Sequence, residues 1–525
     1  MLRLLGYLAI LGIILGACQS DPTAEDVPRP NILFAIADDA SFPHMGAYGC
    51  TWVNTPGFDR IAKEGLLFTN AYTPNAKCAP SRSCILTGRN SWQLEEAANH
   101  IPYFPDKFTT IMESLGENGY FVGHTAKGWA PGQVGERNGK KRQLTGPAFN
   151  DKKTDPPAEH ISNNDYAENF RDFLITKPDS LPFCFWYGST EPHRRYEYGA
   201  GIEKGGKQLS DIDNVPDFWP QNDTVRTDIL DYAFELEYFD QHLAKMLDML
   251  EEAGELANTI VVVTADNGMP FPRVKGQAYE LSNHLPFAIM WPEGIQQPGK
   301  KIEEYISFID IAPTLMEIAQ VPPEESGMQA MQGRSLSYFF ANQLSDSTTW
   351  DYVLLGKERH VIGSPNYWVY PVRVIVNYDY LYIRNYDPDR WPAGNPETGY
   401  LNTDGSPTKT LILDHRQTSN MEQYWKMNFG KRPIEEFYNI SDDPDCVRNL
   451  AYDPEVAPIM ESMKTQMLAE LKAQGDPRMF GRGEIIDEYD YANENTRGFY
   501  ERYMEGEALN AGWVNPTDFQ EIEVE

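Results

Sequence analysis

Polar clusters follow three apolar runs of the sequence, and their residue types could bind a metal ion. The run Asn31–Ala37 ends at Asp38-Asp39, and the run Thr259–Ala265 ends at Asp266-Asn267. A third run, 182–187, precedes Glu191-Pro192-His193. Carboxylate and amide oxygens are hard ligands, which suit calcium or magnesium better than zinc. Such pairs are also common in turns, so their order around other reactive residues decides their meaning.

The segment 78–89, CAPSRSCILTGR, is the most specific motif of the chain. It resembles the signature of the type I sulfatases, CxPSR followed by LTG, in which a maturation enzyme oxidises the cysteine to formylglycine. A hydrated aldehyde offers one hydroxyl that attacks sulfur and a second that expels the product, whereas a thiol transfers sulfate poorly. The resemblance therefore implies a sulfuric ester hydrolase with residue 78 as its nucleophile; the alternative is a buried structural cysteine.

The resemblance also implies roles for residues elsewhere in the chain. One calcium ion would be bound by Asp38, Asp39, Cys78, Asp266 and Asn267. Arg82 would steady the formylglycine hydrate, and the sulfate would be handled by Lys127, His193 and Lys275. Lysines neutralise sulfate oxygens as charge develops, and a histidine or lysine can protonate the leaving alkoxide.

The sequence departs from the family at one position. The family usually reads GKWH, with a histidine two residues after the lysine that helps to eliminate sulfate, but here Trp129 follows Lys127-Gly128. Either another base substitutes, with His124 the nearest candidate in sequence, or the enzyme is slow, or the local alignment is shifted.

The substrate class follows from a further resemblance. The segment 266–272, DNGMPFP, is closer to the heparan N-sulfatase (sulfamidase) branch, whose bacterial members include ulvan-active sulfatases. We therefore expect O-sulfate on an algal polysaccharide such as ulvan, with the N-sulfate of glucosamine as the alternative. Arg194 and Arg195 are expected to contact an anionic sugar, or else to lie in a solvated loop.

Alternating apolar strands and helices predict the fold that positions these residues. Helices are expected over Pro56–Glu64, 110–118 and 224–253, between short buried strands of a largely parallel sheet. Such sheets place ligands at the carboxyl ends of their strands. The resemblance implies an alkaline-phosphatase-like α/β sandwich over 30–349. The β-rich runs beyond Trp350 predict a smaller α+β domain with an antiparallel sheet over 350–477.

Both ends of the chain differ from these domains in their residue composition. Residues 1–18 resemble a bacterial lipoprotein signal that ends at Cys18, the expected lipidation site, and 19–29 would form a tether. We expect an exported lipoprotein of the outer membrane, cell surface or periplasm; a plain secretory signal is the alternative. The tail, 478–525, is acidic and aromatic without a clear period and is expected to lie along the surface or to be partly disordered.

Composition narrows the class of partner. The 525 residues are 41% hydrophobic, enough for a large core, and their formal net charge is −32, which disfavours a nucleic-acid partner. The expected partners are a sulfated glycan, the maturation enzyme and a lipid anchor. Cys50, Cys84, Cys184 and Cys446 could be paired or free.

Two other functions remain open at this point. A phosphodiesterase of the related superfamily would use two transition metals and a Thr or Ser nucleophile, and Cys78 and Asn267 argue against it. A glycan-binding lipoprotein with a lapsed sulfatase site is the non-enzymatic alternative, and Trp129 is the reason to keep it.

Overall fold

The computed structural model describes residues 29–341, 350–511 and 514–520. The predicted signal segment, Cys18 and the tether up to residue 28 lie outside the described residues. Within the described ranges, no helix is long and apolar enough to cross a membrane.

A seven-stranded sheet forms the centre of the larger part of the molecule. In spatial order its strands are β10 (Lys300–Ile302), β2 (Leu66–Phe68), β9 (Phe287–Met290), β8 (Thr259–Ala265), β1 (Asn31–Ala37), β7 (Phe183–Gly188) and β4 (Phe121–Ala126). Only β9 runs antiparallel to its neighbours, so the predicted mixed, mostly parallel sheet is confirmed. Every residue of β1 and β8 is buried, which explains their continuous apolar sequences.

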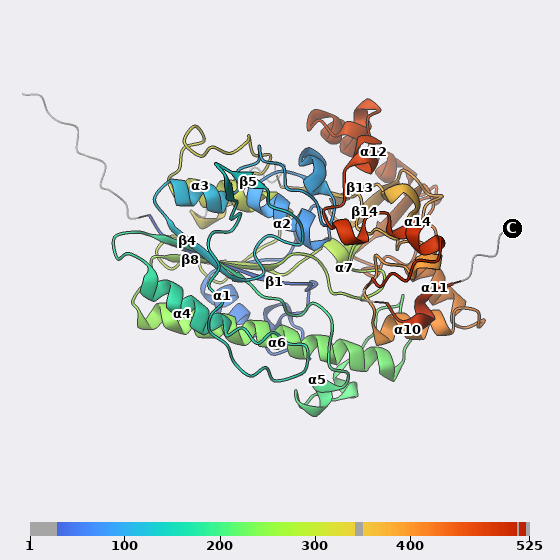
Figure 1. The fold of residues 1–525 in the computed structure, drawn as a ribbon, viewed down its shortest axis with the longest axis horizontal. Coiled ribbons are helices and arrows are strands. Elements are labelled where there is room, and N and C mark those ends of the chain that lie inside the picture. Colours follow the sequence, from blue (N-terminus) through green and yellow to red (C-terminus); the bar gives the residue numbers. More distant parts are fainter. Residues whose placement is uncertain (1–28, 342–349, 512–513, 521–525) are drawn as a thin grey trace, which may run out of the picture.

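Helices cover both faces of this sheet (Figure 1). One face carries α1 (Pro56–Glu64), α4 (Tyr166–Thr176) and α6 (Asp223–Glu252), and the other carries α2 (Cys78–Thr87) and α3 (Ile111–Glu117), against which α8 (Ile311–Ile318) packs. Pro56 begins α1 and Gly65 follows its last residue, as predicted. Thr110 caps α3 in a capping box with Glu113. The three-layer sandwich follows from these amphipathic helices.

The second sheet is antiparallel, as predicted. Its order is β12 (Tyr352–Lys357), β13 (Val372–Asn377), β14 (Tyr380–Asn385) and β15 (Glu435–Asn439), and α12 (Ala457–Ala473) packs on it (Figure 1). Strand β13 begins directly after Pro371, which lacks the N–H that a ladder needs. Between β14 and β15 lie α10 (Pro407–Asp414) and α11 (Glu422–Phe429).

The remaining elements are short. They are β3 (Ala71–Tyr72) paired with β11 (Ile306–Ser307), β5 (Glu136–Arg137) paired with β6 (Lys140–Lys141), and the helices α5 (Ala200–Glu203), α7 (Glu280–Asn283) and α9 (Ser337–Phe340). The cysteines at 50, 78, 84, 184 and 446 are all free thiols in the described structure.

The C-terminal tail is more structured than its sequence suggested. Its described residues contain α13 (Ile485–Glu488) and α14 (Phe499–Met504). Tyr491 and Phe499 are buried against Ile362 and Leu401 of the preceding part of the chain. Aromatic residues that follow no regular period in the sequence thus anchor the tail to the C-terminal part, the portion of the chain from residue 350 that contains the second sheet. The boundaries at 349 and 477 stay predictions.

A buried ionic network fastens the antiparallel sheet to its surroundings. Arg373 of β13 contacts Asp476 through Nε at 2.7 Å and Glu358 through Nη2 at 2.7 Å. Glu358 also accepts a hydrogen bond from Arg478 Nε at 3.1 Å, and the Arg373 guanidinium lies over the Trp92 ring. The network therefore joins the second sheet to the segment that follows α2.

We predict that Asp476→Ala lowers the free energy of unfolding by about 3–5 kcal/mol, because it leaves the buried Arg373 with one carboxylate instead of two. Urea unfolding measures the change. Asp155→Ala, at an exposed position, serves as control and should change stability by no more than about 0.5 kcal/mol. Equal stability of the two variants would contradict the role given to the network.

Candidate active site

The carboxyl ends of four neighbouring parallel strands meet at one edge of the large sheet. Asp38 and Asp39 follow β1, and Asp266 and Asn267 follow β8. On the other side of β1, the segment that contains His193 follows β7, and Lys127 follows β4. Sheet order thereby brings together residues that are far apart in sequence.

Cys78 lies at the first position of α2, directed at this edge. Its side chain is buried, and its Sγ lies 3.6 Å from Asp38 Oδ1. Burial raises the pKa of the Cys78 thiol to about 12, an effect that the nearby Lys127 reduces but does not cancel. At neutral pH the thiol therefore stays protonated and is a weak nucleophile.

Four potential ligand atoms, one each from Asp38, Asp39, Cys78 and Asp266, lie within 4.8 Å of one another. Asn267 donates a hydrogen bond from Nδ2 to Asp39 Oδ1 at 2.7 Å, while its own Oδ1 is buried without a hydrogen-bond partner among the described residues. A buried, unsatisfied amide oxygen beside three carboxylates fits a hard cation such as calcium.

Basic side chains balance these carboxylates one by one. Lys127 Nζ lies 2.5 Å from Asp38, Lys275 Nζ lies 2.6 Å from Asp39, and Arg82 Nε lies 2.7 Å from Asp266. Burial alone would raise the pKa of Asp38, but Lys127, His193 and Arg82 hold it well below its ordinary value. Burial and Asp38 raise the pKa of Asp266.

His193 and Arg82 are each oriented by main-chain carbonyls. His193 Nδ1 contacts the Arg194 carbonyl oxygen at 2.6 Å, so that Nε2 faces Asp39 Oδ2 at 3.9 Å. The Arg82 guanidinium donates to the carbonyl oxygens of Lys127 and Gly128 at 2.9 and 2.7 Å. These two hydrogen bonds of Arg82 link α2 directly to the segment that follows β4.

Asp404 belongs to this group, although its sequence context gave no signal for it. It accepts a hydrogen bond from Lys275 Nζ at 2.9 Å, and one of its carboxylate oxygens lies within 4.8 Å of ligand atoms of Asp39 and His193. The pair Asp404-Gly405 resembles an ordinary turn and precedes α10 of the C-terminal part.

Trp129 and His124 both lie away from the carboxylates. Trp129 Nε1 donates to Ser83 Oγ of α2 at 2.7 Å, and its buried ring packs edge-on against Phe104. His124 Nδ1 contacts the Gly146 carbonyl oxygen at 3.0 Å. The structure therefore does not bring His124 into the site as a replacement for the histidine that the family has at position 129.

The two arginines after His193 differ sharply in their surroundings. Arg194 makes a paired contact with Asp228 at 2.7 and 2.9 Å, donates to the Pro270 carbonyl oxygen and stacks on Phe271. Arg195 is exposed and forms no ion pair with any described residue. Arg194 thus holds its loop against α6, and only Arg195 keeps a free guanidinium for a ligand.

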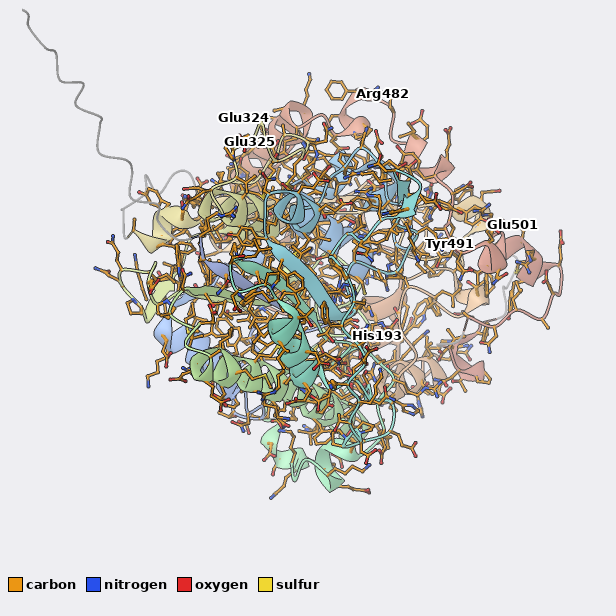
Figure 2. The ribbon with its side chains drawn as sticks, turned by 60° about the vertical axis from the view of Figure 1, so that its left-hand side comes forward. His193, Glu324, Glu325, Arg482, Tyr491 and Glu501 are labelled. Carbon is orange, nitrogen blue, oxygen red and sulfur yellow. The ribbon has the colours of Figure 1, made fainter. Side chains whose placement is uncertain are left out.

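A cavity of about 640 Å³ opens over the site. It is lined by residues from several segments, among them Lys77, His100, His193, Lys275, Asp404 and Tyr491. Figure 2 shows His193 and the tail residue Tyr491 on the same side of the molecule. The volume lies in the range of about 300–1,000 Å³ that is typical of ligand pockets.

Comparison with known proteins gives the family. The sulfatase family model matches residues 30–321, more than half of the chain. An ulvan-active sulfatase of Formosa agariphila is 28% identical over 85% of this chain and 81% of its own length. Human N-sulphoglucosamine sulphohydrolase is 25% identical over 91% of this chain and 95% of its own length.

Solved structures share the fold at lower identity. One, a complex with D-glucosamine-2-N,6-O-disulfate, is 19% identical with a TM-score of 0.59 and covers 86% of this chain and 99% of its own. The phosphonate monoester hydrolase of Agrobacterium radiobacter is 17% identical with a TM-score of 0.58, over 85% and 96% of the two chains. These likenesses confirm the alkaline-phosphatase-like fold, and the family match assigns the chain to the sulfatases, a family of sulfuric ester hydrolases.

Proposed function

We propose that this sulfatase removes sulfate from a sulfated polysaccharide or its oligosaccharides, through a formylglycine made from Cys78 and with one calcium ion. The observation that carries the proposal is the buried cluster of Asp38, Asp39, Cys78 and Asp266, flanked by Lys127 and Lys275. Carboxylates that could bind a cation and lysines that could bind an anion are thus gathered around residue 78.

Calcium would be held by Asp38, Asp39, Asp266, Asn267 and residue 78. The unsatisfied Asn267 Oδ1 and the closely spaced carboxylates support this ligand set. When bound, the ion would neutralise carboxylate charge and draw electron density from a sulfate oxygen.

The state of Cys78 supports its conversion to formylglycine. Burial raises the pKa of the Cys78 thiol to about 12, so the thiolate that would act as nucleophile is a very minor species at neutral pH. The aldehyde hydrate supplies a hydroxyl nucleophile instead. A maturation enzyme that reads the segment 78–89 is the partner that this step requires.

The surrounding side chains have distinct tasks in the proposed reaction. Lys127 and Lys275, whose carboxylate partners keep their pKa values raised despite burial, stay protonated and neutralise the sulfate oxygens. His193 Nε2, on the open side of the site, is positioned to donate a proton to the leaving sugar oxygen. Arg82, fixed by Asp266 and two carbonyl oxygens, holds the first turn of α2 and residue 78 in place.

Among sulfated glycans, ulvan is our leading candidate. The similarity to ulvan-active sulfatases of Formosa agariphila supports it, and similarity to human N-sulphoglucosamine sulphohydrolase supports N-sulfated glucosamine as the alternative. We further propose export as a lipoprotein anchored through Cys18, which rests on the N-terminal sequence alone.

The first prediction of the proposed function concerns the reaction. Protein whose residue 78 is shown by peptide mass spectrometry to be formylglycine should release sulfate from ulvan oligosaccharides or N-sulfated heparin oligosaccharides, as measured by ion chromatography. Cys78→Ala should release none, because it has no nucleophile. Absence of release by fully converted protein from ulvan, fucoidan, carrageenan and heparin oligosaccharides would instead favour a glycan-binding protein without activity.

The second prediction concerns the metal. Adding calcium to chelator-treated protein should raise its thermal unfolding temperature, since binding at 100 times the dissociation constant contributes about 2.7 kcal/mol to the folded state. Asp38→Asn should diminish this rise, because it removes a charged ligand. Asp155→Asn, at an exposed position away from the cluster, is the matched control and should respond like the unmodified chain. An undiminished response of Asp38→Asn would rule out this ligand set.

The third prediction separates the two arginines. Arg195→Ala should raise KM for an oligosaccharide about tenfold or more and leave KM for a small aryl sulfate nearly unchanged, since a charged hydrogen bond contributes about 1.5–3 kcal/mol. Arg194→Ala should mainly lower the unfolding temperature, because it leaves Asp228 buried without its guanidinium partner. Equal effects of Arg195→Ala on both substrates would show that Arg195 does not contact the sugar chain.

A further inference from the structure

Lys77 is a buried cation of the cavity. Lys77, the residue before the nucleophile position and the N-cap of α2, lines the cavity and is 4% exposed. It forms no ion pair with any residue that the structure describes, whereas Lys127 and Lys275 each have at least one. Lys127 and Lys275 are thus paired directly with carboxylates of the protein, whereas Lys77 has only the longer-range attraction of groups such as Asp404, whose direct partner is Lys275.

A buried nitrogen without a hydrogen-bond partner among the described residues lines the same cavity near Lys77. Nδ1 of His100 is buried and lacks a hydrogen-bond partner within the described ranges. Burial lowers the pKa of His100 well below its ordinary value, and the positive charge of Lys77 lowers it further, so the imidazole is neutral at pH 7. A neutral imidazole presents one N–H donor, which an anion can accept from.

The loop that carries His100 is firmly held. The His100 N–H donates to the Arg359 carbonyl oxygen at 2.9 Å, and the Ala492 N–H of the tail donates to the Ile101 carbonyl oxygen at 3.0 Å. Arg359 in turn donates to the Tyr489 carbonyl oxygen at 2.6 Å. The tail and the C-terminal part therefore fix the backbone at position 100, beside the cavity.

Burying an ammonium without a counter-charge is unfavourable, and a ligand anion removes this cost. The sulfate that is removed would already be neutralised by Lys127 and Lys275, which lie beside the carboxylates around residue 78. Lys77 adds a positive charge to those of Lys127 and Lys275, and His100 adds an N–H hydrogen-bond donor. A substrate with only one anionic group leaves Lys77 without a direct ion-pair partner.

We propose that Lys77 and His100 form a second anion subsite, which binds a further carboxylate or sulfate group on the substrate beside the sulfate that is removed. The inference rests on the proposed function and deepens it: the preferred substrate carries at least two anionic groups within the reach of one cavity.

Kinetics on matched substrates test the subsite. One pair is a sulfated, uronate-containing disaccharide and its carboxyl-reduced form; the other is a disulfated saccharide and its monosulfated form. Lys77→Met should raise KM at least tenfold on the member with the second anionic group and less than twofold on the other, with kcat within twofold on both. The pair that shows the split identifies the anion as carboxylate or sulfate.

Three control variants accompany this measurement. Lys77→Arg keeps the charge and should retain most of the affinity, and His100→Ala should give a smaller split of the same sign. Lys245→Met removes one positive charge from an exposed position of α6 and should behave like the unmodified enzyme. An equal rise in KM on both members of each pair, or no rise on either, would overturn the subsite.

Binding separates this inference from the proposed function. Calorimetric titration of Cys78→Ala and of Cys78→Ala/Lys77→Met with the same saccharides needs no turnover. At least tenfold weaker binding of only the dianionic saccharides by the double variant supports the subsite, even if converted protein releases no sulfate. Equal binding of these saccharides by both variants refutes the subsite while leaving the sulfatase reaction intact.

Discussion

Repulsion among three buried carboxylates is the constraint around which the catalytic part is arranged. Asp38, Asp39 and Asp266 lie buried at the ends of two adjacent parallel strands. Each is matched by a basic side chain from a different segment, Lys127 after β4, Lys275 after β8 and Arg82 within α2. Removing one partner leaves an uncompensated buried charge, which is far more costly than losing a surface ion pair.

The smaller, C-terminal part of the molecule contributes to this charge compensation and to the wall of the active-site cavity. Asp404, which precedes α10, is the second carboxylate partner of Lys275, and His360 and Tyr491 line the cavity. The catalytic sheet supplies the reactive edge, and the C-terminal part and the tail supply much of the wall above it. We therefore expect that relatives of similar fold which act on different substrates differ mainly in the sequences of these later segments.

Periodicity and motif together predicted the centre of the site but not its surroundings. Continuous apolar runs located β1 and β8 with their observed bounds, because strands covered on both faces carry a strong signal. Because β1 and β8 are parallel neighbours, the polar residues that follow them lie at the same edge of the sheet. Lys77, His100 and Asp404 had no such signal, since loops that meet only in the tertiary structure leave no local pattern. Trp129 was recognised as a departure, but its contact with Ser83 required the structure.

The burial of Cys78 has a consequence for how active molecules arise. Its side chain is 2% exposed, at the start of a helix whose ten residues are all buried. We therefore expect a maturation enzyme to reach that sulfur only before the chain has folded. Under the proposed function, oxidation must therefore precede the closure of the sheet around α2. A molecule that folds before Cys78 is oxidised remains inactive. The active fraction of a preparation is therefore set by the rate of Cys78 oxidation relative to the rate of folding.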